Sequence, residues 1–317
     1  MSVAPEANVS PVEVEVAPTP GMCREESSGE QVLSSEERDA GYRTGGLEWG
    51  TITWIALLHV GALAALFCFT WVGLATAVVL FWLTGSIGIC LGYHRLFAHR
   101  SFKTYAVVER GLAIIGVLGG EGSPLFWVSA HRKHHKFSDQ DEDPHSPKDG
   151  LWWSHFLWLF PRTDPDPQET FQRYAKDLLQ ERFHRLLHGT FICWHFVLGF
   201  ALFGVGWAMW DLRTGVSLVL FGIFLRLTCV LHVTWLVNSA SHIWGYRNYE
   251  TRDNSRNLWW VGLLAFGEGW HNNHHAFPGR ARHGHRWWEF DLTYRTICLM
   301  EKVGLVWDVK HGREGRA

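Results

Sequence analysis

The sequence predicts an all-helical integral membrane protein, in which four membrane-spanning helices carry a helical cap on one side of the bilayer. Three observations support this fold class. Apolar residues make up 47% of the 317 residues, two long stretches of the chain are almost free of charge, and many of the 19 histidines gather in short groups outside those stretches. The net charge of −2 leaves no basic excess to neutralise phosphates, so it argues against a nucleic-acid partner.

Residues 1–50 differ in composition from the rest of the chain. They contain ten acidic residues and only three arginines. They also lack the apolar segment that a secretory signal requires. A segment of this kind cannot bury enough apolar surface to fold. We therefore predict a disordered acidic tail over residues 1–50, with a regulatory or targeting role as the alternative.

Two apolar stretches predict two helical hairpins. No charged residue occurs from residue 51 to residue 93. A membrane-spanning helix needs about 20 residues, so this stretch suits two helices, near 51–70 and 74–93. A second pair covers 189–210 and 215–238, joined by the short sequence DLRT. A buried helical hairpin of a soluble protein is the alternative, but two such hairpins exceed what one soluble core needs.

Two hairpins return the chain to its starting side, so residues 1–50, 94–188 and 239–317 are expected on one face of the membrane. These segments hold 27 of the 29 Lys and Arg residues. The positive-inside tendency makes that face, with both termini, cytoplasmic. Arg226 lies mid-way along the fourth apolar stretch, where an unpaired charge is costly. Either it faces the protein interior or the helix is shifted along the chain.

Two shorter apolar stretches, 112–128 and 258–266, are too short to span the bilayer, and we expect interfacial or re-entrant packing for both. Three pairs of adjacent tryptophans, at 152–153, 259–260 and 287–288, fall on the predicted cytoplasmic face. They suit either anchoring at the lipid headgroups or ordinary core packing. The six scattered cysteines contain no CxxC pair, which predicts buried reduced thiols rather than disulfides or thiolate metal ligands.

The histidines of the predicted cytoplasmic face occur in three groups. The second and third groups repeat the spacing i, i+3, i+4, which puts three imidazoles on one face of a helix. Eight imidazoles clustered on one side of a membrane favour a shared metal site over eight separate structural roles. The groups are His94 and His99; His131, His134 and His135; and His271, His274 and His275.

The remaining histidines give a weaker signal. Several lack such clustering, and we predict ordinary structural roles for them. His283 follows the third group but falls outside the ligand spacing, so it is not assigned to metal. The unclustered residues are His59, His184, His188, His195, His232 and His311.

Imidazole nitrogen suits zinc, copper, iron and nickel ions. Eight such nitrogens exceed the needs of one ion and match two ions with open coordination positions. The HExxH motif of zinc proteases is absent. Neutral imidazoles leave the charge of the ions uncompensated, which helps them to bind anions derived from O2. A two-iron oxygen-activating centre therefore fits better than hydrolytic zinc.

Around these groups the sequence resembles the membrane-bound fatty-acid desaturases, specifically the Δ9 acyl group that includes the stearoyl-CoA desaturases, and more nearly its bacterial and cyanobacterial members. The resemblance runs from about residue 51 to residue 307, which implies a membrane desaturase domain at 51–307 and a C-terminal tail at 308–317. The segments that carry it are GYHRLFAHRSFKT, SAHRKHHKFSDQDEDPHSP, TWLVNSASHIWGYRNYETRDNSRN and GEGWHNNHHAFPGRARHG.

The resemblance implies a ninth metal ligand that spacing alone misses. The segment NSASH matches the end of the family's fourth spanning helix, where His242 is a ligand and Asn238 contacts one iron through water. The eight clustered histidines all carry over as ligands. We also expect carboxylates to bond ligand imidazoles from behind, with Asp143, Asp253 and Glu268 as the candidates.

The implied reaction consumes O2 and two electrons, removes two hydrogens from adjacent methylenes of a saturated acyl chain, and yields a cis double bond, expected at Δ9, and two waters. A narrow apolar tunnel would choose the methylenes. The acyl chain would be carried by CoA or by a membrane lipid. Arg280, Arg282 and Arg286 are candidate contacts for the carrier, with a solvated or lipid-facing basic surface as the alternative.

Electrons are expected from a separate donor, either a ferredoxin or a cytochrome b5 with its reductase, because only ten residues follow Trp307. Two other functions stay open at this point. A fatty-acid or alkane hydroxylase shares the same histidine chemistry. A metal transporter would use histidines as a relay, but it would need polar residues inside the spans, and these groups lie outside them.

Overall fold

The computed structural model describes residues 45–162, 164 and 166–312. Residues 1–44 of the predicted acidic tail therefore lie outside the described residues. The described residues include Glu48, whose N–H donates a 2.7 Å hydrogen bond to Phe160 O, and the first helix begins at residue 49. Within the predicted C-terminal tail, Lys310 N–H donates to Ser101 O at 2.9 Å. Residues 313–317 lie outside the described residues.

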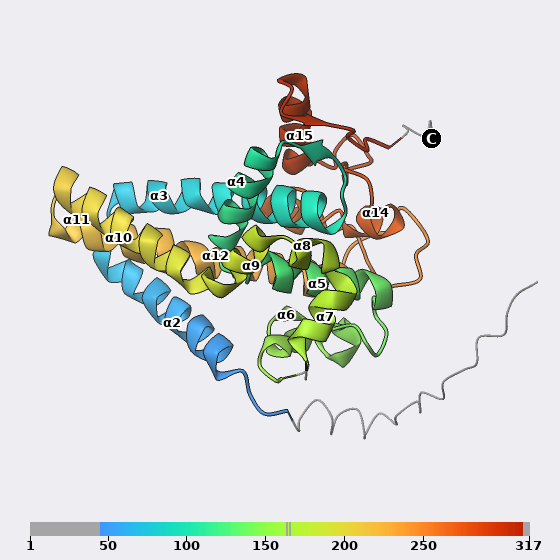
Figure 1. The fold of residues 1–317 in the computed structure, drawn as a ribbon, viewed down its shortest axis with the longest axis horizontal. Coiled ribbons are helices and arrows are strands. Elements are labelled where there is room, and N and C mark those ends of the chain that lie inside the picture. The colour runs from blue at the N-terminus through green and yellow to red at the C-terminus, as the bar shows by residue number, and fades with distance from the viewer. Residues whose placement is uncertain (1–44, 163, 165, 313–317) are drawn as a thin grey trace, which may run out of the picture. The chain divides into compact units, whose positions relative to one another are not determined.

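Four long apolar helices form the two predicted hairpins, and Figure 1 shows them extending away from α5 and α14. The helical fold class with four membrane-spanning helices is confirmed. The spans are α2 with the short η1 (Trp49–Ala65, Leu66–Cys68), α3 with the π-helical η2 (Trp71–Phe81, Trp82–Ala98), α10 (Phe191–Met209), and α11, η5 and α12 in sequence (Leu212–Val219, Leu220–Leu225, Arg226–Ile243).

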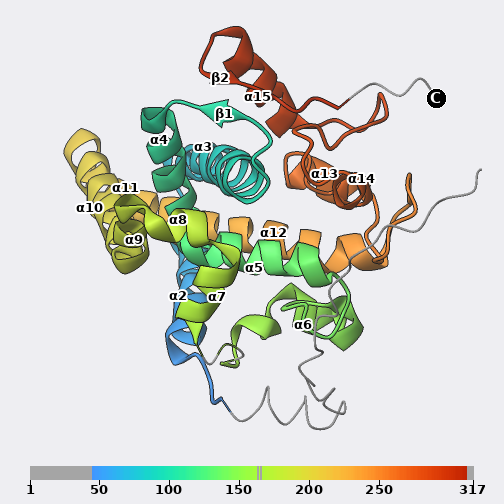
Figure 2. The same ribbon diagram turned by 45° about the vertical axis from the view of Figure 1, so that its right-hand side comes forward.

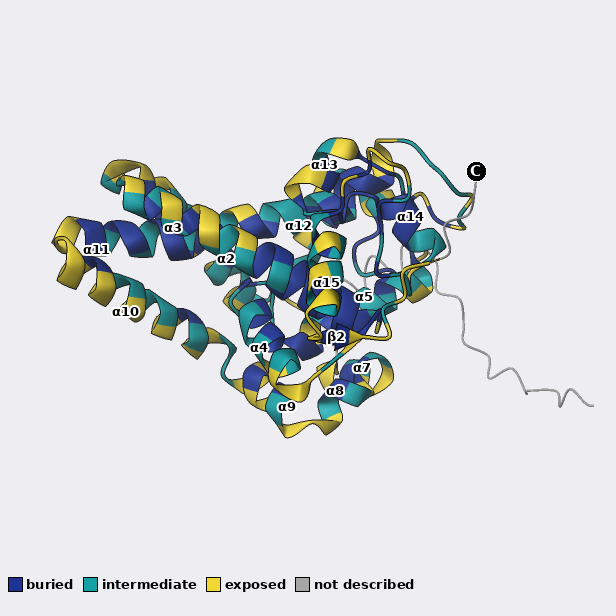
Figure 3. Ribbon diagram, turned by 90° about the horizontal axis from the view of Figure 1, so that it is seen from above, coloured by how far each residue is buried: buried dark blue, intermediate teal, exposed yellow. Residues whose placement is uncertain are grey.

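The second and fourth spans are longer than a bilayer requires. They contain 28 and 32 residues. At 1.5 Å per residue these helices are about 42 and 48 Å long, against a hydrocarbon core of about 30 Å. Their far ends therefore project into the cap. Half of the most apolar stretch of the fourth span is buried, against 11% of the corresponding stretch of α10, so α10 is an outer, lipid-facing helix. Figure 3 shows α10 mostly exposed or intermediate, whereas the cap helix α14 is mostly buried.

Short helices between and after the hairpins build the cap. Figure 2 looks nearly along α3, with α5 and α12 below it and α13 and α14 beside it. A two-residue antiparallel strand pair, β1 with β2, joins Lys103 to Trp307. The elements are β1 (Lys103–Thr104), α4 (Ala106–Val117), α5 (Pro124–Phe137), η3 (Pro147–Asp149), α6 (Leu151–His155), η4 (Leu157–Leu159), α7 (Pro167–Tyr174), α8 (Lys176–Gln180), α9 (Arg182–Gly189), α13 (Trp259–Leu264), α14 (His271–Ala276), α15 (Leu292–Lys302) and β2 (Val306–Trp307).

Local sequence explains where several of these helices begin. Thr70 caps α3 by accepting a hydrogen bond from Gly73 N–H, and Asp211 caps α11 by accepting one from Thr214 N–H. Ser123 caps α5, whose first residue is Pro124, a residue that suits the first helical position. These caps place the hairpin turns and start the helix that carries the second histidine group.

Arg226 faces the protein interior, which resolves the alternative left by the sequence. Its side chain is buried, and Nε donates to Gly222 O at 2.8 Å. Nη1 donates to Leu118 O and lies 3.5 Å from Thr84 Oγ1. Arg226 thus ties the end of α4 to the second and fourth spans, away from lipid.

The two short apolar stretches pack against the spans without crossing the membrane. The first forms the end of α4 and the start of α5, and α4 lies along η2. The second contains α13, and the ring of Phe266 just after it lies 5.3 Å from the ring of Phe81 in α3. Trp152, Trp259 and Trp287 are exposed, so core packing is wrong for at least one tryptophan of each pair.

The cysteine prediction is correct in part. The described cysteines are free thiols, and Cys90 is buried. Cys193 and Cys229 are exposed instead, both on spanning helices. A thiol on the lipid-facing surface of a span needs no burial inside the protein. Apolar neighbours in the sequence therefore do not distinguish a buried cysteine from a lipid-facing one.

Candidate metal centre

The three histidine groups lie at the ends of helices that enter the cap. His94 is in the last turns of η2, and His99 is its C-terminal cap residue. The second group lies in the last turns of α5, and the third occupies most of α14. His242 is the penultimate residue of α12. Helices from four parts of the chain therefore bring nine histidines together.

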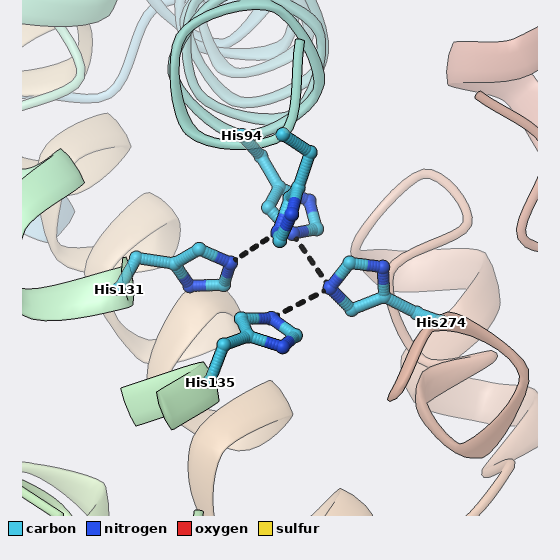
Figure 4. A group of neighbouring side chains, drawn as sticks. His94, His131, His135 and His274 are labelled. Carbon is cyan, nitrogen blue, oxygen red and sulfur yellow. Dashed lines mark hydrogen bonds between the residues drawn. The ribbon is translucent and has the colours of Figure 1, made fainter. Parts of the chain in front are cut away.

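The structure divides these nine residues between two sites. In the first, Nε2 of His274 lies 3.0 Å from Nε2 of His94 and 2.9 Å from Nε2 of His135. Figure 4 shows His94, His131, His135 and His274 pointing toward one another from three directions. The ligand nitrogens of this five-histidine group lie within 4.8 Å of one another, and its members are His94, His99, His131, His135 and His274.

The second site is the four-histidine group. It takes one residue from the second sequence group, two from the third, and His242, whose Nε2 lies 3.0 Å from Nε2 of His271. Its ligand nitrogens also lie within 4.8 Å of one another, and its members are His134, His242, His271 and His275. The spacing in the sequence predicts which histidines share a helical face. It does not predict which group each one joins, because neighbouring histidines of one face belong to different groups.

The ring nitrogens converge in a way that hydrogen bonds alone do not satisfy. A nitrogen of a neutral imidazole ordinarily makes one hydrogen bond, as donor or acceptor, yet Nε2 of His274 faces two other ring nitrogens. In the four-histidine group, Nε2 of His134 and Nε2 of His275 are buried without a hydrogen-bond partner. A cation at each centre would satisfy these nitrogens, so the residues present fit two metal ions.

All three carboxylates expected from the sequence contact an imidazole of these groups. Asp143 Oδ1 accepts a 2.9 Å hydrogen bond from Nδ1 of His134. Asp253 Oδ2 accepts one of 2.8 Å from Nδ1 of His275. Glu268 Oε2 lies 2.8 Å from Nδ1 of His94. The two hydrogen bonds at Nδ1 fix the rings of His134 and His275 so that Nε2 faces the centre.

The structure adds a fourth carboxylate that the sequence did not indicate. Asp139 lies 3.4 Å from Nδ1 of His242, and its backbone lies in the left-handed region with φ of 59°. Asp139 N–H donates to Asp143 Oδ2 at 2.8 Å, which couples the two aspartates. An aspartate tolerates this backbone conformation better than most residues. The signal in the sequence would have been the aspartate-rich segment that follows the second histidine group.

Burial sets the charge of several of the clustered rings. It lowers the pKa of His131, His135 and His274 well below the ordinary value for imidazole. Burial likewise lowers the pKa of His275 to about 4. These rings are therefore neutral at physiological pH, which is the form of imidazole that binds metal ions.

Comparison with known proteins agrees with this geometry. The family model for fatty acid desaturases matches residues 69–297. The chain is 43% identical over 261 residues to an sn-2 palmitoyl-lipid 9-desaturase of Nostoc sp. (strain 36), covering 82% of this chain and 89% of the relative.

Two further relatives have the same kind of name. One is an sn-1 stearoyl-lipid 9-desaturase of Anabaena variabilis, 44% identical over 266 residues, which are 83% of this chain and 94% of the relative. The other is a Delta-9 acyl-lipid desaturase 2 of Arabidopsis thaliana, 42% identical over 253 residues, which are 80% of each chain. The chain belongs to the fatty acid desaturase family. It is a membrane enzyme whose substrate is a fatty acyl chain.

The desaturase has a cavity where the two histidine groups meet the spans. Asn238 lines it, and so do histidines of both groups. Trp127 also lines it and stacks on His131, with ring centroids 4.9 Å apart. The other lining residues are mostly apolar and include Phe81, Ile89, Val230, Val233, Val237 and Phe266.

The three arginines after the third histidine group lie outside both histidine groups. The guanidinium of Arg280 lies 3.6 Å from the centre of the Phe277 ring. Arg286 stacks near Tyr246 and Trp288, and it is exposed. Arg282 is half-buried and donates from Nε to a backbone carbonyl. The desaturase thus presents a basic and aromatic surface beyond α14.

Of the other histidines, some lie beside the two histidine groups and some bond one another between the spans. His283, which spacing excluded from the ligands, has its ring 4.4 Å from the ring of His274 and its Nδ1 3.0 Å from Glu268. The ring of His145 stacks on the ring of His134, a ligand candidate, with the two centroids 4.4 Å apart. His59 and His232, predicted to be structural, bond one another at 3.0 Å between the spans.

Proposed function

We propose that this desaturase binds two iron ions in the five-histidine and four-histidine groups and introduces a cis double bond at Δ9 of a saturated acyl chain, with O2 as co-substrate. The observation that carries the proposal is the cavity. It is lined both by histidines of the two groups and by apolar side chains of the spans, including Ile89 and Val237. An acyl chain lying there would have its methylenes beside both centres. The nine histidines and Asn238 are the proposed metal-binding residues.

When bound, the irons would supply the oxygen chemistry that removes two hydrogens from the chain. The protein's own residues perform the positioning. Apolar residues such as Phe81 and Phe266 exclude water and hold the chain by contact alone. Trp127 fixes the plane of His131 by stacking, and the carboxylates behind the rings hold their tautomers.

We propose a lipid-linked acyl chain as the substrate, since the relatives from Nostoc, Anabaena and Arabidopsis are named for acyl lipids. CoA is the alternative carrier, and one relative of Anemone leveillei is named an acyl-CoA 5-desaturase. Arg280, Arg282 and Arg286 are proposed contacts for the polar part of either carrier. If these arginines bind CoA, Arg282→Glu should raise the KM for an acyl-CoA. Unchanged kinetics would overturn the assignment of the arginines to the carrier.

Two proposals concern the surroundings of the enzyme. Electrons come from a separate donor, either a ferredoxin or a cytochrome b5 with its reductase. The cap, and with it both termini, faces the cytoplasm, because nearly all Lys and Arg residues lie on that side of the spans. We further propose that the predicted desaturase domain, 51–307, works as one unit together with the ordered residues on either side of it.

Expression in a host that lacks its own Δ9 desaturase tests the function directly. Gas chromatography of the fatty acids should show a cis Δ9 product that is absent from cells with the empty vector. A hydroxylated product instead would favour the related hydroxylase reaction. Metal uptake into proteoliposomes without any change in acyl chains would favour a transporter and overturn the proposal.

A further inference from the structure

The two histidine groups differ in the negative charge that surrounds them. Three aspartates contact the four-histidine group, at distances of 2.9, 2.8 and 3.4 Å from the Nδ1 atoms of His134, His275 and His242. Among the described residues, only one carboxylate, Glu268, contacts an imidazole of the five-histidine group. The group with fewer histidines therefore has more anionic partners.

Neutral donors hold the three aspartates. Asp143 accepts from the backbone N–H groups of Asp139 and His145, at 2.8 and 3.1 Å. Asp253 accepts from Ser255 N–H at 3.0 Å and from the hydroxyl of Thr251 at 2.9 Å. Within the described part of the chain, no Lys or Arg forms an ion pair with any of the three. Their charge therefore acts on the neighbouring imidazoles without compensation.

The charge of Glu268 is compensated in part. Arg95, which is fully buried, lies 3.2 Å from Glu268 Oε1 through Nη2 and 2.9 Å from Asp291 Oδ1. Oε2 of Glu268 is shared between His94 and His283 at 2.8 and 3.0 Å and makes no well-aligned hydrogen bond to either. The one carboxylate behind the five-histidine group therefore stands beside a fixed positive charge.

We propose that Asp139, Asp143 and Asp253 are positioning residues that make the two metal sites unequal, so that the four-histidine group favours the more highly charged state of its ion. This inference rests on the proposed two-iron function. A carboxylate behind an imidazole makes the ring a stronger electron donor and attracts a trivalent ion more than a divalent one. When the reduced pair loses a single electron, the ferric ion should form in the four-histidine group while the five-histidine group keeps ferrous iron.

The test uses the full-length protein loaded with 57Fe, and the iron content per chain is measured first. The reduced protein is titrated with ferricyanide, which takes one electron per molecule, and Mössbauer spectra follow each iron. Wild type should oxidise in two separate one-electron steps. Asp143→Asn and Asp253→Asn keep a hydrogen-bond acceptor but remove the charge, so each should disfavour the first step by about tenfold in its equilibrium constant.

Two matched variants complete the design. Glu268→Gln should leave the first step in place, because its charge lies behind the other group. Asp211→Asn makes the same chemical change at the far turn between α10 and α11 and should move neither step. The inference is overturned if the aspartate variants leave the first step unmoved, or if Glu268→Gln moves it more than they do. Fewer than two irons in wild type would instead overturn the proposed function on which the inference rests.

Discussion

At the scale of single residues, His274 is the most connected member of the five-histidine group, since its Nε2 faces two other ring nitrogens. We predict that His274→Ala abolishes unsaturated product and lowers bound iron from two ions to about one per chain. Elemental analysis and gas chromatography measure both quantities. His311→Ala is the control, because His311 lies outside both groups and bonds Tyr294 and Glu301. Full iron and full activity in His274→Ala would contradict the assignment.

Glu121 offers a prediction about pH. Burial raises its pKa to about 7, despite hydrogen bonds from the Thr234 hydroxyl at 2.6 Å and the Trp127 indole at 2.8 Å that favour the carboxylate. A raised pKa means that the folded protein binds a proton that the unfolded chain releases above pH 4.5. Stability should therefore fall as pH rises from about 4.5 to about 7 and stay low above that range.

Glu121→Gln removes this titration while its amide still reaches both partners. At pH 8 the variant should be more stable than wild type by about 2 kcal/mol, a value reduced for partial exposure, and at pH 4.5 the two should be alike. Thermal unfolding of purified protein at the two pH values measures the difference. A variant that is equally stabilised at both pH values would show that charge burial is not the cause.

Residue roles could be predicted where they form a local pattern. The eight clustered histidines are visible as spacings in the sequence, and His242 becomes visible only through resemblance. Asp139 and His283 were not predicted, because each reaches the site from a segment between helices whose path depends on distant contacts. Asp139 accepts from Asn254 N–H, more than 100 residues further along the chain, and His283 shares Glu268 with His94.

At the scale of elements, α4 and η2 pack so closely that a glycine is required between them. A Cβ atom at Gly88 would lie 2.7 Å from the carbonyl carbon of Ile115 and 2.8 Å from Gly116 N. Gly88→Ala should therefore separate the two helices and destabilise the protein by about 1–3 kcal/mol. Because η2 carries His94, iron binding should weaken as well.

Gly111→Ala is a matched control on α4, since nothing lies within 4 Å of its Cβ position. It should stabilise the helix by up to about 1 kcal/mol through helix propensity alone. Melting temperatures in the same detergent compare the two variants with wild type. Equal effects of both substitutions would mean that the close contact between α4 and η2 does not limit stability.

The elements themselves were predictable where the chain lacks charge, and less so where charge is buried. Both hairpins follow from uncharged stretches of sufficient length. The second span was predicted to end at residue 93, but η2 continues to Ala98 because Arg95 is buried between Glu268 and Asp291. An arginine usually marks the end of an apolar helix. Only contacts made about 170 and 200 residues later in the chain reverse that expectation.

At the scale of the whole molecule, the described elements have a definite sidedness with respect to the bilayer. Both hairpins turn on the side away from the cap, and Arg213 is exposed at the second turn, beside the helix cap of α11. Lys148 is exposed in the cap, between the second histidine group and α6. In the orientation proposed from the distribution of Lys and Arg, the cap side is cytoplasmic. The two residues should therefore meet different aqueous compartments.

Single-cysteine labelling decides the orientation. In a background without native cysteines, Arg213→Cys should react with a membrane-impermeant maleimide in intact cells. Lys148→Cys should react only after the cells are opened. Neither side chain belongs to the histidine groups, so both variants should keep their iron, which verifies that the labelled protein is folded. The reverse labelling pattern would put the cap outside, where a ferredoxin or cytochrome b5 of the cytoplasm could not deliver electrons to it.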